Sequence, residues 1–190
     1  MNYAEIYSED YYSLYGNMGI PYIGNQLLMG NFRLLAYNLK SMFPDAKTHL
    51  DVGCAAGYLV DKMRDIGLES TGVDLPYIIK TTNVQNLHAF DLTKIYLPDV
   101  LPDSKYDLVT CIEVAEHIYK EDENNFFFNL KNVTGKYLMF SSAEDYDEPT
   151  HVNVHPAEYW KQKLTEFGFS EIKKSYRPIP WATFWKKNDG

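Results

Sequence analysis

The chain is poor in positive charge and in cysteine, and it has no long apolar run. Its 190 residues hold 18 lysines and arginines against 26 acidic residues, a formal net charge of −8, which argues against the broad basic surface that a nucleic-acid backbone requires. The two cysteines, Cys54 and Cys111, are too few for a disulfide framework, so we expect reduced, packed thiols. No apolar stretch approaches the roughly twenty residues that span a bilayer, and the first residues lack the features of a secretion signal. We therefore expect a cytoplasmic protein without a membrane segment.

The composition is that of one domain. Hydrophobic residues make up 45% of the chain, enough for a sizeable core, and no shift in composition marks a boundary. We expect a single domain over residues 1–190, with residues 1–45 as an aromatic and helical N-terminal cap and residues 48–185 as the core. Tyrosine, glycine and proline crowd residues 1–23, which predicts an irregular aromatic segment ahead of the first long helix.

Short apolar runs alternate with helical patterns along the core. We expect strands at residues 48–52, 70–73, 87–90, 106–112 and 136–140, and helices at residues 25–43, 58–66, 77–85, 121–131 and 156–167. This alternation predicts parallel β-α-β units, and hence a Rossmann-like, mostly parallel α/β sheet with helices on both faces. Two further strands, near residues 169–176 and 181–185, follow each other too closely for a crossover helix, so they should run antiparallel.

The segment from Thr48 to Tyr58, THLDVGCAAGY, is the most informative part of the chain. An apolar strand enters a turn of small residues and then an amphipathic helix. Gly53, Ala55 and Gly57 let a bound molecule approach the backbone closely, and the N–H groups that open the helix point toward the same place. The pattern predicts a site for a nucleotide-like ligand.

The turn departs from the fingerprint of dinucleotide-binding folds. Tyr58 stands where the third glycine of G-x-G-x-x-G allows close packing of helix and strand. Asp51, at the end of the strand, would oppose a pyrophosphate and would favour a cationic amino-acid group or a hydroxyl donor. A nicotinamide or flavin cofactor is therefore the second choice for this site.

Acidic residues end four consecutive predicted strands: Asp51, Asp74, Asp91 and Glu113. The carboxyl ends of parallel strands meet at the edge of the sheet where ligands bind, so these side chains should converge. Asp74 follows Gly53 by 21 positions (74 − 53), close to the spacing at which an acidic residue meets ribose hydroxyls. We therefore expect an adenosine-containing ligand.

With these motifs in this order, residues 48–176 resemble the class I S-adenosylmethionine-dependent methyltransferases. The segment from Asp51 to Gly57 matches their first motif, with Ala55 in place of the usual central glycine. The resemblance implies a seven-stranded sheet with the last strand inserted antiparallel, S-adenosylmethionine as the cofactor, and an N-terminal cap over it. It implies that the turn passes beneath the methionine part, that Asp74 binds the ribose hydroxyls and that Asp91 and Leu92 flank the adenine. The expected cofactor-binding residues are Asp51, Gly53, Cys54, Ala55, Gly57, Tyr58, Asp74, Leu75, Asp91, Leu92 and Glu113.

A second candidate site follows the fourth predicted strand. Glu113, Glu116 and His117 stand at positions i, i+3 and i+4, which share one face on a helical turn. His151, after the fifth strand, should lie at the same edge of the sheet. Carboxylate and imidazole ligands together suit a divalent cation, and the oxygen ligands favour Mg²⁺ or Mn²⁺. These four residues are the predicted metal ligands.

Three other histidines are weaker candidates. His49 and His88 fall in predicted strands and are expected to be packed side chains. His155 precedes Pro156 at a helix start, where it serves either as a further ligand or as a cap.

The E-x-x-E-H segment with its later histidine resembles two branches of the methyltransferases, the small-RNA 3′-terminal 2′-O-methyltransferases and the ubiquinone-pathway O-methyltransferases. That resemblance implies that the metal binds an acceptor hydroxyl and lowers its pKa. In the alternative, no metal binds, the glutamate contacts the cofactor and the histidine is a loop cap or a general base. The candidate catalytic residues are His117, Glu116 and His151.

We predict an S-adenosylmethionine-dependent methyltransferase that methylates a hydroxyl of a small molecule or glycan. A short RNA end is the one nucleic-acid acceptor left open, through the resemblance above. Two other classes stay as alternatives: a nicotinamide-dependent Rossmann oxidoreductase, and a module that binds S-adenosylmethionine without catalysis.

Overall fold

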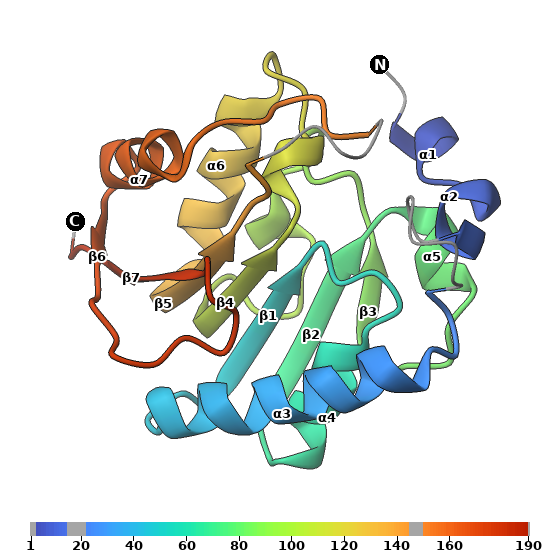
Figure 1. The fold of residues 1–190 in the computed structure, drawn as a ribbon, viewed down its shortest axis with the longest axis horizontal. Helices are drawn as coiled ribbons and strands as arrows, with labels where there is room; N and C mark the ends of the chain where they lie inside the picture. The colour runs from blue at the N-terminus through green and yellow to red at the C-terminus, as the bar shows by residue number, and fades with distance from the viewer. Residues whose placement is uncertain (1–2, 15–21, 145–149, 190) are drawn as a thin grey trace. The chain divides into compact units, whose positions relative to one another are not determined.

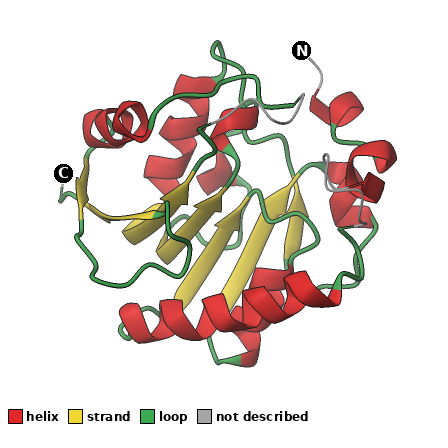
Figure 2. Ribbon diagram, in the orientation of Figure 1, coloured by secondary structure: helices red, strands yellow, loops and turns green. Residues whose placement is uncertain are grey.

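The computed structural model describes residues 3–14, 22–144 and 150–189. The chain forms two compact units, Met1–Asp91 and Leu92–Gly190. In each unit, strands are flanked by helices (Figures 1 and 2). No helix in these described ranges has both the length and the apolar character needed to cross a membrane.

The first unit is built from parallel β-α-β segments. Its strands pair in the order β3-β2-β1, and both pairs, β1 with β2 and β2 with β3, are parallel. The elements are α1 (Tyr3–Ile6), α2 (Glu9–Leu14), α3 (Gln26–Met42), β1 (Thr48–Val52), α4 (Tyr58–Asp65), β2 (Glu69–Asp74), α5 (Pro76–Lys80) and β3 (Leu87–Ala89).

The long helix α3 begins and ends close to the predicted positions. Asn25 caps its start, because the side-chain oxygen accepts hydrogen bonds from the main-chain N–H groups of Leu27 and Leu28. One face of the helix is buried, including Leu35 and Leu39, and α3 packs against α4, which in turn contacts β1 and β2. These contacts hold the start of α4, and with it the small-residue turn, at the carboxyl end of β1.

The second unit mixes parallel and antiparallel pairs. Its strands pair in the order β4-β5-β7-β6; β5 is parallel to β4, and β7 lies between β5 and β6 and is antiparallel to both. The elements are η1 (Leu97–Asp99), β4 (Tyr106–Ile112), η2 (Ala115–His117), α6 (Glu123–Val133), β5 (Thr134–Ser141), α7 (Ala157–Glu166), β6 (Phe169–Glu171) and β7 (Thr183–Lys187). The prediction of a mostly parallel sheet with the last strand inserted antiparallel is confirmed.

Aromatic side chains fill the core of the second unit. Phe127 on α6 stacks on Trp160 of α7, with 6.0 Å between ring centroids, and also contacts Phe140 of β5. All three are almost fully buried. Burial of two or three such rings contributes several kcal/mol, of the order of 2 kcal/mol each. This cluster packs α6 and α7 against β5.

Three elements differ from the sequence prediction. The helix expected over residues 77–85 ends at Lys80. Beyond it the Thr82 hydroxyl donates to Ala56 O and accepts from the N–H of Val84, which holds the chain in a turn. The strand expected to reach residue 176 ends at Glu171. The N-terminal segment, expected to be irregular, contains α1 and α2; residues 15–21 of the same segment lie outside the described residues.

Candidate functional site

The small-residue turn after β1 is shaped by its backbone. Gly53 and Gly57 have φ angles of 77° and 78°, in the left-handed region that favours glycine. The N–H groups of Gly53 and Cys54 both donate to Val73 O, at 2.9 and 3.1 Å, and the N–H of Gly57 donates to Cys54 O at 2.8 Å. A Cβ atom at Gly57 would lie 2.7 Å from Leu87 Cδ1, so a larger residue would have to displace the Leu87 side chain in addition to straining the backbone. The turn is thus tied to β2 and closed on itself.

Ala55 occupies the left-handed region too, with φ of 45°. This is the position at which the class I methyltransferases have the central glycine of their first motif. The left-handed backbone explains why glycine is preferred there. A side chain in this region costs of the order of 1 kcal/mol relative to glycine. The short methyl group is the smallest addition that an L-residue can make to the turn.

Asp74, at the end of β2, is joined to the turn directly. Its Oδ2 accepts from the N–H of Ala55 at 2.6 Å and its Oδ1 accepts from the N–H of Leu75 at 2.6 Å. Burial raises the pKa of Asp74 to about 6, although both N–H groups oppose the shift. The acidic residue 21 positions after Gly53 (74 − 53) therefore lies against the turn that Gly53 opens.

The remaining cofactor candidates of the first unit have different surroundings. Cys54 is buried, and its Sγ lies so close to Gly72 that a Cβ there would be 2.7 Å away. Asp51 is buried at the end of β1, and its negative charge, after burial and Asp74, helps to raise the pKa of the Cys54 thiol. Both cysteines of the chain are buried and neither is part of a disulfide, in agreement with the composition. Asp91 is the last residue of the first unit and Leu92, which is buried, the first of the second.

The second candidate site brings together three of the four predicted metal ligands. One ligand atom each from Glu116, His117 and His151 lie within 4.8 Å of one another. The rings of His117 and His151 meet edge to face, with 4.9 Å between their centroids. Glu116 and His117 come from the η2 turn after β4, and His151 comes from the segment before α7. The sequence prediction that these segments meet is supported by the geometry.

The main chain holds His151 from both sides. His117 Nδ1 lies 3.1 Å from Thr150 O, which can only accept, so Nδ1 is the donor and Nε2 carries the lone pair in the neutral ring. On the other side, the N–H groups of Val152 and Asn153 both donate to Glu116 O, at 2.9 Å each. The residues on either side of His151 are therefore fastened to the two residues that share the site with it.

Glu116 is a fully buried carboxyl group. Ser142 Oγ donates to its Oε2 and the N–H of Ala143 donates to its Oε1, both at 3.0 Å. Burial raises the pKa of Glu116 to about 8, and the negative charge of Glu113 adds to the effect. No lysine or arginine in the described part of the chain forms an ion pair with Glu116. A buried carboxyl group of this kind is suited to the charge of a metal ion.

Glu113 lies outside this group. Its φ of 53° is in the left-handed region, so the chain does not make the regular helical turn that the i, i+3, i+4 argument assumed. Its Oε1 accepts from Ser141 Oγ at 2.6 Å and from Trp181 Nε1 at 2.8 Å. The expectation that Glu113 shares a face with Glu116 and His117 was wrong for this structural reason.

Sequence reasoning missed a network that supports the site. Asn153 Nδ2 donates to Glu123 Oε2 at 2.9 Å, in addition to the main-chain bond of Asn153 to Glu116. The Glu123 carboxylate also accepts from Tyr159 and forms an ion pair of 2.7 Å with Lys163. Although burial raises the pKa of Glu123, these hydrogen bonds outweigh it and lower the pKa to about 2. No motif connects these residues in the sequence, and only their packing reveals them.

The other histidines are outside the group. His49 is completely buried, its Nδ1 lies 2.7 Å from Ser70 Oγ, and burial lowers its pKa to about 3. His88 is half-buried and stacks near Phe90. His155 stacks on Tyr159, with 3.8 Å between ring centroids, and its Nε2 meets Asn153 Oδ1. The expectation that His49 is a packed residue is confirmed.

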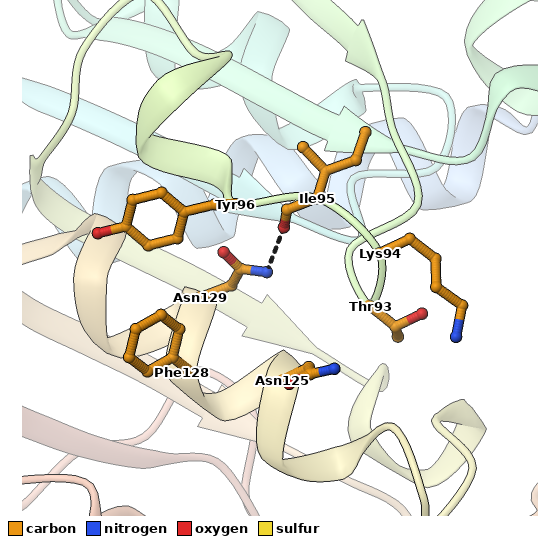
Figure 3. A pocket seen from close by; sticks show the side chains of 7 residues that line it. All are labelled: Thr93, Lys94, Ile95, Tyr96, Asn125, Phe128 and Asn129. Atoms are coloured by element: carbon orange, nitrogen blue, oxygen red, sulfur yellow. Dashed lines mark hydrogen bonds between the residues drawn. The ribbon is translucent and has the colours of Figure 1, made fainter.

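A pocket of about 220 Å³ lies elsewhere in the second unit, between residues 93–96 and α6 (Figure 3). Asn129 shapes it by donating to Leu92 O and Ile95 O, while the rings of Tyr96 and Phe128 line one side, 5.7 Å apart. None of the predicted site residues lines this pocket.

Known proteins show similarity over most of the chain. The chain is 34% identical over 149 residues to the ubiquinone biosynthesis O-methyltransferase of Serratia proteamaculans, covering 72% of this chain and 60% of the relative. It is 34% identical over 142 residues to the protein of the same name from Proteus mirabilis, covering 70% and 56%. The chain spans between about half and three fifths of the length of the curated relatives that it matches.

Solved structures show the same fold at lower identity. A protein from Pyrococcus horikoshii superimposes with a TM-score of 0.67 at 16% identity, over 98% of this chain and all of the other. A SAM dependent methyltransferase from Archaeoglobus fulgidus gives a TM-score of 0.62 at 20% identity, over 82% and 94%.

The strand arrangement and these structures show a Rossmann-like fold, and with the family match they place the chain among the class I S-adenosylmethionine-dependent methyltransferases, as the sequence motifs predicted. The chain belongs to the methyltransferase domain family, which matches residues 27–174. The match includes the small-residue turn, Asp74 and the Glu116, His117 and His151 group, and it favours a methyltransferase over a nicotinamide oxidoreductase.

Proposed function

We propose that this methyltransferase transfers the methyl group of S-adenosylmethionine to a hydroxyl of a small-molecule acceptor, with Glu116, His117 and His151 holding a divalent metal ion. The observation that carries the proposal is the convergence of these three side chains within 4.8 Å. The names of the curated relatives, ubiquinone biosynthesis O-methyltransferases, support an oxygen acceptor on a small molecule. Glycans and a short RNA end stay as alternative acceptors.

The first unit supplies the cofactor site in this proposal. Asp74, held by the N–H groups of Ala55 and Leu75, accepts the ribose hydroxyls. The turn from Gly53 to Gly57 passes beneath the methionine part, where the absence of large side chains permits close approach. Asp91 and Leu92 flank the adenine, as the family resemblance implies.

The donor set fits a divalent metal. Two imidazole nitrogens and one carboxylate oxygen suit Mn²⁺ better than Mg²⁺, which prefers oxygen ligands alone. Hydrogen bonding of His117 Nδ1 to Thr150 O fixes the tautomer that leaves Nε2 available, an arrangement common among metal-bound histidines. Glu116, buried and without a lysine or arginine ion-pair partner within the ranges described, would supply the negative charge when a metal ion displaces its proton.

The reaction needs orientation more than activation, because the sulfonium methyl group is already electrophilic. A lone pair of the acceptor oxygen forms a bond to the methyl carbon while the carbon–sulfur bond breaks. The electron pair of the broken bond stays on sulfur, which gives S-adenosylhomocysteine. The hydroxyl proton leaves to solvent or to a basic side chain. A bound metal supplies Lewis acidity that lowers the pKa of the acceptor hydroxyl. The histidines and Glu116 then fix where that hydroxyl lies.

Metal content tests the proposal. We expect the protein to bind one equivalent of Mn²⁺ by isothermal titration calorimetry, and His117→Ala and Glu116→Gln to lose it. His88→Ala is the matched control, because His88 is a half-buried histidine outside the group, and this variant should bind Mn²⁺ normally. Full Mn²⁺ content in both site variants, or none in the unchanged protein, would contradict the metal site.

Methyl transfer separates the metal interpretation from the general-base alternative. The protein is incubated with methyl-labelled S-adenosylmethionine and a simple catechol, 3,4-dihydroxybenzoate, with Mn²⁺ or with EDTA. Label transfer that requires Mn²⁺ supports the proposal. Transfer that persists in EDTA but is lost in His117→Ala supports His117 as a general base. Tight binding of S-adenosylhomocysteine without transfer to catechol, glycan or RNA-end acceptors would point to a non-catalytic module.

A further inference from the structure

Tyr58 is the residue that sets this turn apart from a dinucleotide fingerprint. It stands where the third glycine would be, and it is the first residue of α4. Its side chain is only 8% exposed, so a large phenol is buried at the edge of the cofactor turn. A glycine there would serve close helix–strand packing; a buried phenol needs another partner.

The partner of Tyr58 is the chain just ahead of α3. The Tyr58 hydroxyl donates to Tyr22 O at 3.2 Å and accepts from the N–H of Gly24 at 2.6 Å. The rings of Tyr22 and Tyr58 are stacked, with 5.6 Å between centroids and an angle of 2° between planes. Two hydrogen bonds and one ring stack therefore fasten this segment to the first residue after the turn.

A second contact joins α2 to α5, the helix that follows Asp74. Tyr12 of α2 stacks on Tyr77 of α5, with 6.3 Å between centroids and 16° between planes. Helix α5 begins two residues after Asp74, and α2 lies next to α5 in Figure 1. Because the N–H of Tyr22 donates to Tyr12 O at 3.0 Å, the two attachments are themselves joined.

Electrostatics agree with this placement. Tyr12 is buried, and its pKa is raised well above the ordinary value by that burial and, next, by the negative charge of Asp74. The phenol is therefore neutral and lies within electrostatic range of the carboxylate to which we assign the ribose hydroxyls. A neutral hydroxyl and an aromatic ring suit the wall of a nucleoside site.

We propose that Tyr58 is a positioning residue that holds residues 22–24, and through them Tyr12 of α2, onto the cofactor turn, so that Tyr12 and Tyr22 form a wall of the S-adenosylmethionine site beside Asp74. The wall slows departure of the cofactor, and the Tyr58 hydroxyl acts through Tyr22 and Gly24. The inference rests on the cofactor-binding part of the proposed function and is independent of the metal site.

The Tyr58→Phe variant tests this role, because it removes the two hydrogen bonds and keeps the ring. We expect the dissociation constant for S-adenosylhomocysteine, measured by calorimetry, to rise about fivefold, which corresponds to one or two ordinary hydrogen bonds. The dissociation rate in stopped-flow displacement should rise by a similar factor while association changes little. Tyr58→Leu, which also removes the stack, should weaken binding further, by roughly another fivefold. The matched control is Tyr37→Phe on α3, where the side chain is 59% exposed and binding should not change.

An unchanged dissociation constant and dissociation rate in Tyr58→Phe would overturn the proposal. A role confined to folding would lower the melting temperature of the free protein and leave the dissociation rate alone, and that result would overturn it too. Failure of the unchanged protein to bind S-adenosylhomocysteine would remove cofactor binding itself, and with it both proposals. Loss of the Mn²⁺ site alone would leave the role of Tyr58 intact.

Discussion

The two candidate sites are built in different ways. In the first unit, the turn from Gly53 to Gly57 takes its shape from left-handed backbone angles and from main-chain hydrogen bonds. In the second unit, the group of Glu116, His117 and His151 takes its shape from contacts between segments about thirty residues apart. A site of the first kind is contained in one stretch of sequence. A site of the second kind depends on the packing around it. Substitutions of residues that belong to no motif can therefore disrupt it.

Removal of the Glu123 carboxylate should have the largest effect. It would disrupt the second site by removing the network that supports the His151 segment. Glu123→Ala leaves Lys163, which is mostly buried, without its ion-pair partner, and it removes the hydrogen bond of Asn153 Nδ2, so that within the described residues the Asn153 side chain keeps only its contact with His155. Loss of one member of a buried pair costs about 3 kcal/mol, measured as the free energy of unfolding in urea. Mn²⁺ affinity should fall as well, because Asn153 helps to hold the His151 segment.

The control for this variant is Glu121→Ala, two positions earlier on the exposed surface. A surface substitution of this kind changes stability by less than about 0.5 kcal/mol. If Glu123→Ala is as mild as Glu121→Ala, the network does not support the site and the contrast between the two regions disappears.

A methyl group at Gly57 should break the first site through its backbone. Gly57→Ala places a Cβ 2.7 Å from Leu87 Cδ1 in a residue whose φ is 78°, and we expect a loss of about 2 kcal/mol from strain and contact together. Gly30→Ala is the opposite case, because Gly30 lies inside α3 and nothing beyond its chain neighbours and its own helix backbone is within 4 Å of the added carbon. It should stabilise the protein by about 0.5–1 kcal/mol in the same urea titration. Equal effects of the two substitutions would contradict this account.

The pH dependence of cofactor binding tests the chemical contribution of Asp74. Burial raises its pKa to about 6, and the ribose hydroxyls need the ionised form as acceptor. Affinity for S-adenosylhomocysteine should therefore fall about tenfold between pH 7 and pH 5. In the free protein the sign is opposite: the raised pKa favours protonated Asp74, so stability decreases as the pH rises from about 4 to about 6.

Asp74→Asn is the control for this titration, because an amide does not ionise. At pH 7 the variant should bind S-adenosylhomocysteine more weakly than the unchanged protein does. Its own affinity at pH 5 should equal its affinity at pH 7. A pH-independent affinity in the unchanged protein would mean that Asp74 does not accept the ribose hydroxyls in its ionised form.

The contrast between the sites explains what the sequence could predict. The strands from Thr48 and from Tyr106 begin where the apolar runs indicated, and the turn with its partner Asp74 was predictable because local spacing determines it. The meeting of His117 with His151 followed from sheet topology alone. The left-handed residue Glu113 was not predictable, because its carboxylate is held by Ser141 and Trp181.

The contacts that support the two sites were not predictable from the sequence either, because they too join segments that are distant in the chain. Glu123 gathers Asn153, Tyr159 and Lys163 through the packing of α6 and α7, and no periodic pattern records such a network. Tyr58 was visible as a departure from a glycine motif, but its attachment to Tyr22 and Gly24 required the fold. Short motifs thus predict local geometry, whereas the long-range contacts that support a site can be identified only in the folded structure.

The smallest expected effect concerns Ala55, whose φ of 45° strains a non-glycine residue. Ala55→Gly removes about 1 kcal/mol of strain from the folded protein, but it also loosens the unfolded chain, which costs about 0.5–1 kcal/mol. We therefore expect a net stabilisation between zero and about 0.5 kcal/mol in urea unfolding. The neighbour Ala56 is the matched control: it is buried and does not share the positive φ, so Ala56→Gly should lose about 1 kcal/mol. The same substitution at adjacent positions should then be neutral or stabilising at Ala55 and destabilising at Ala56, because the two residues differ in backbone conformation and in burial. Equal destabilisation at both positions would show that the turn relaxes around Ala55, and that its shape is set by packing in the way the second site is.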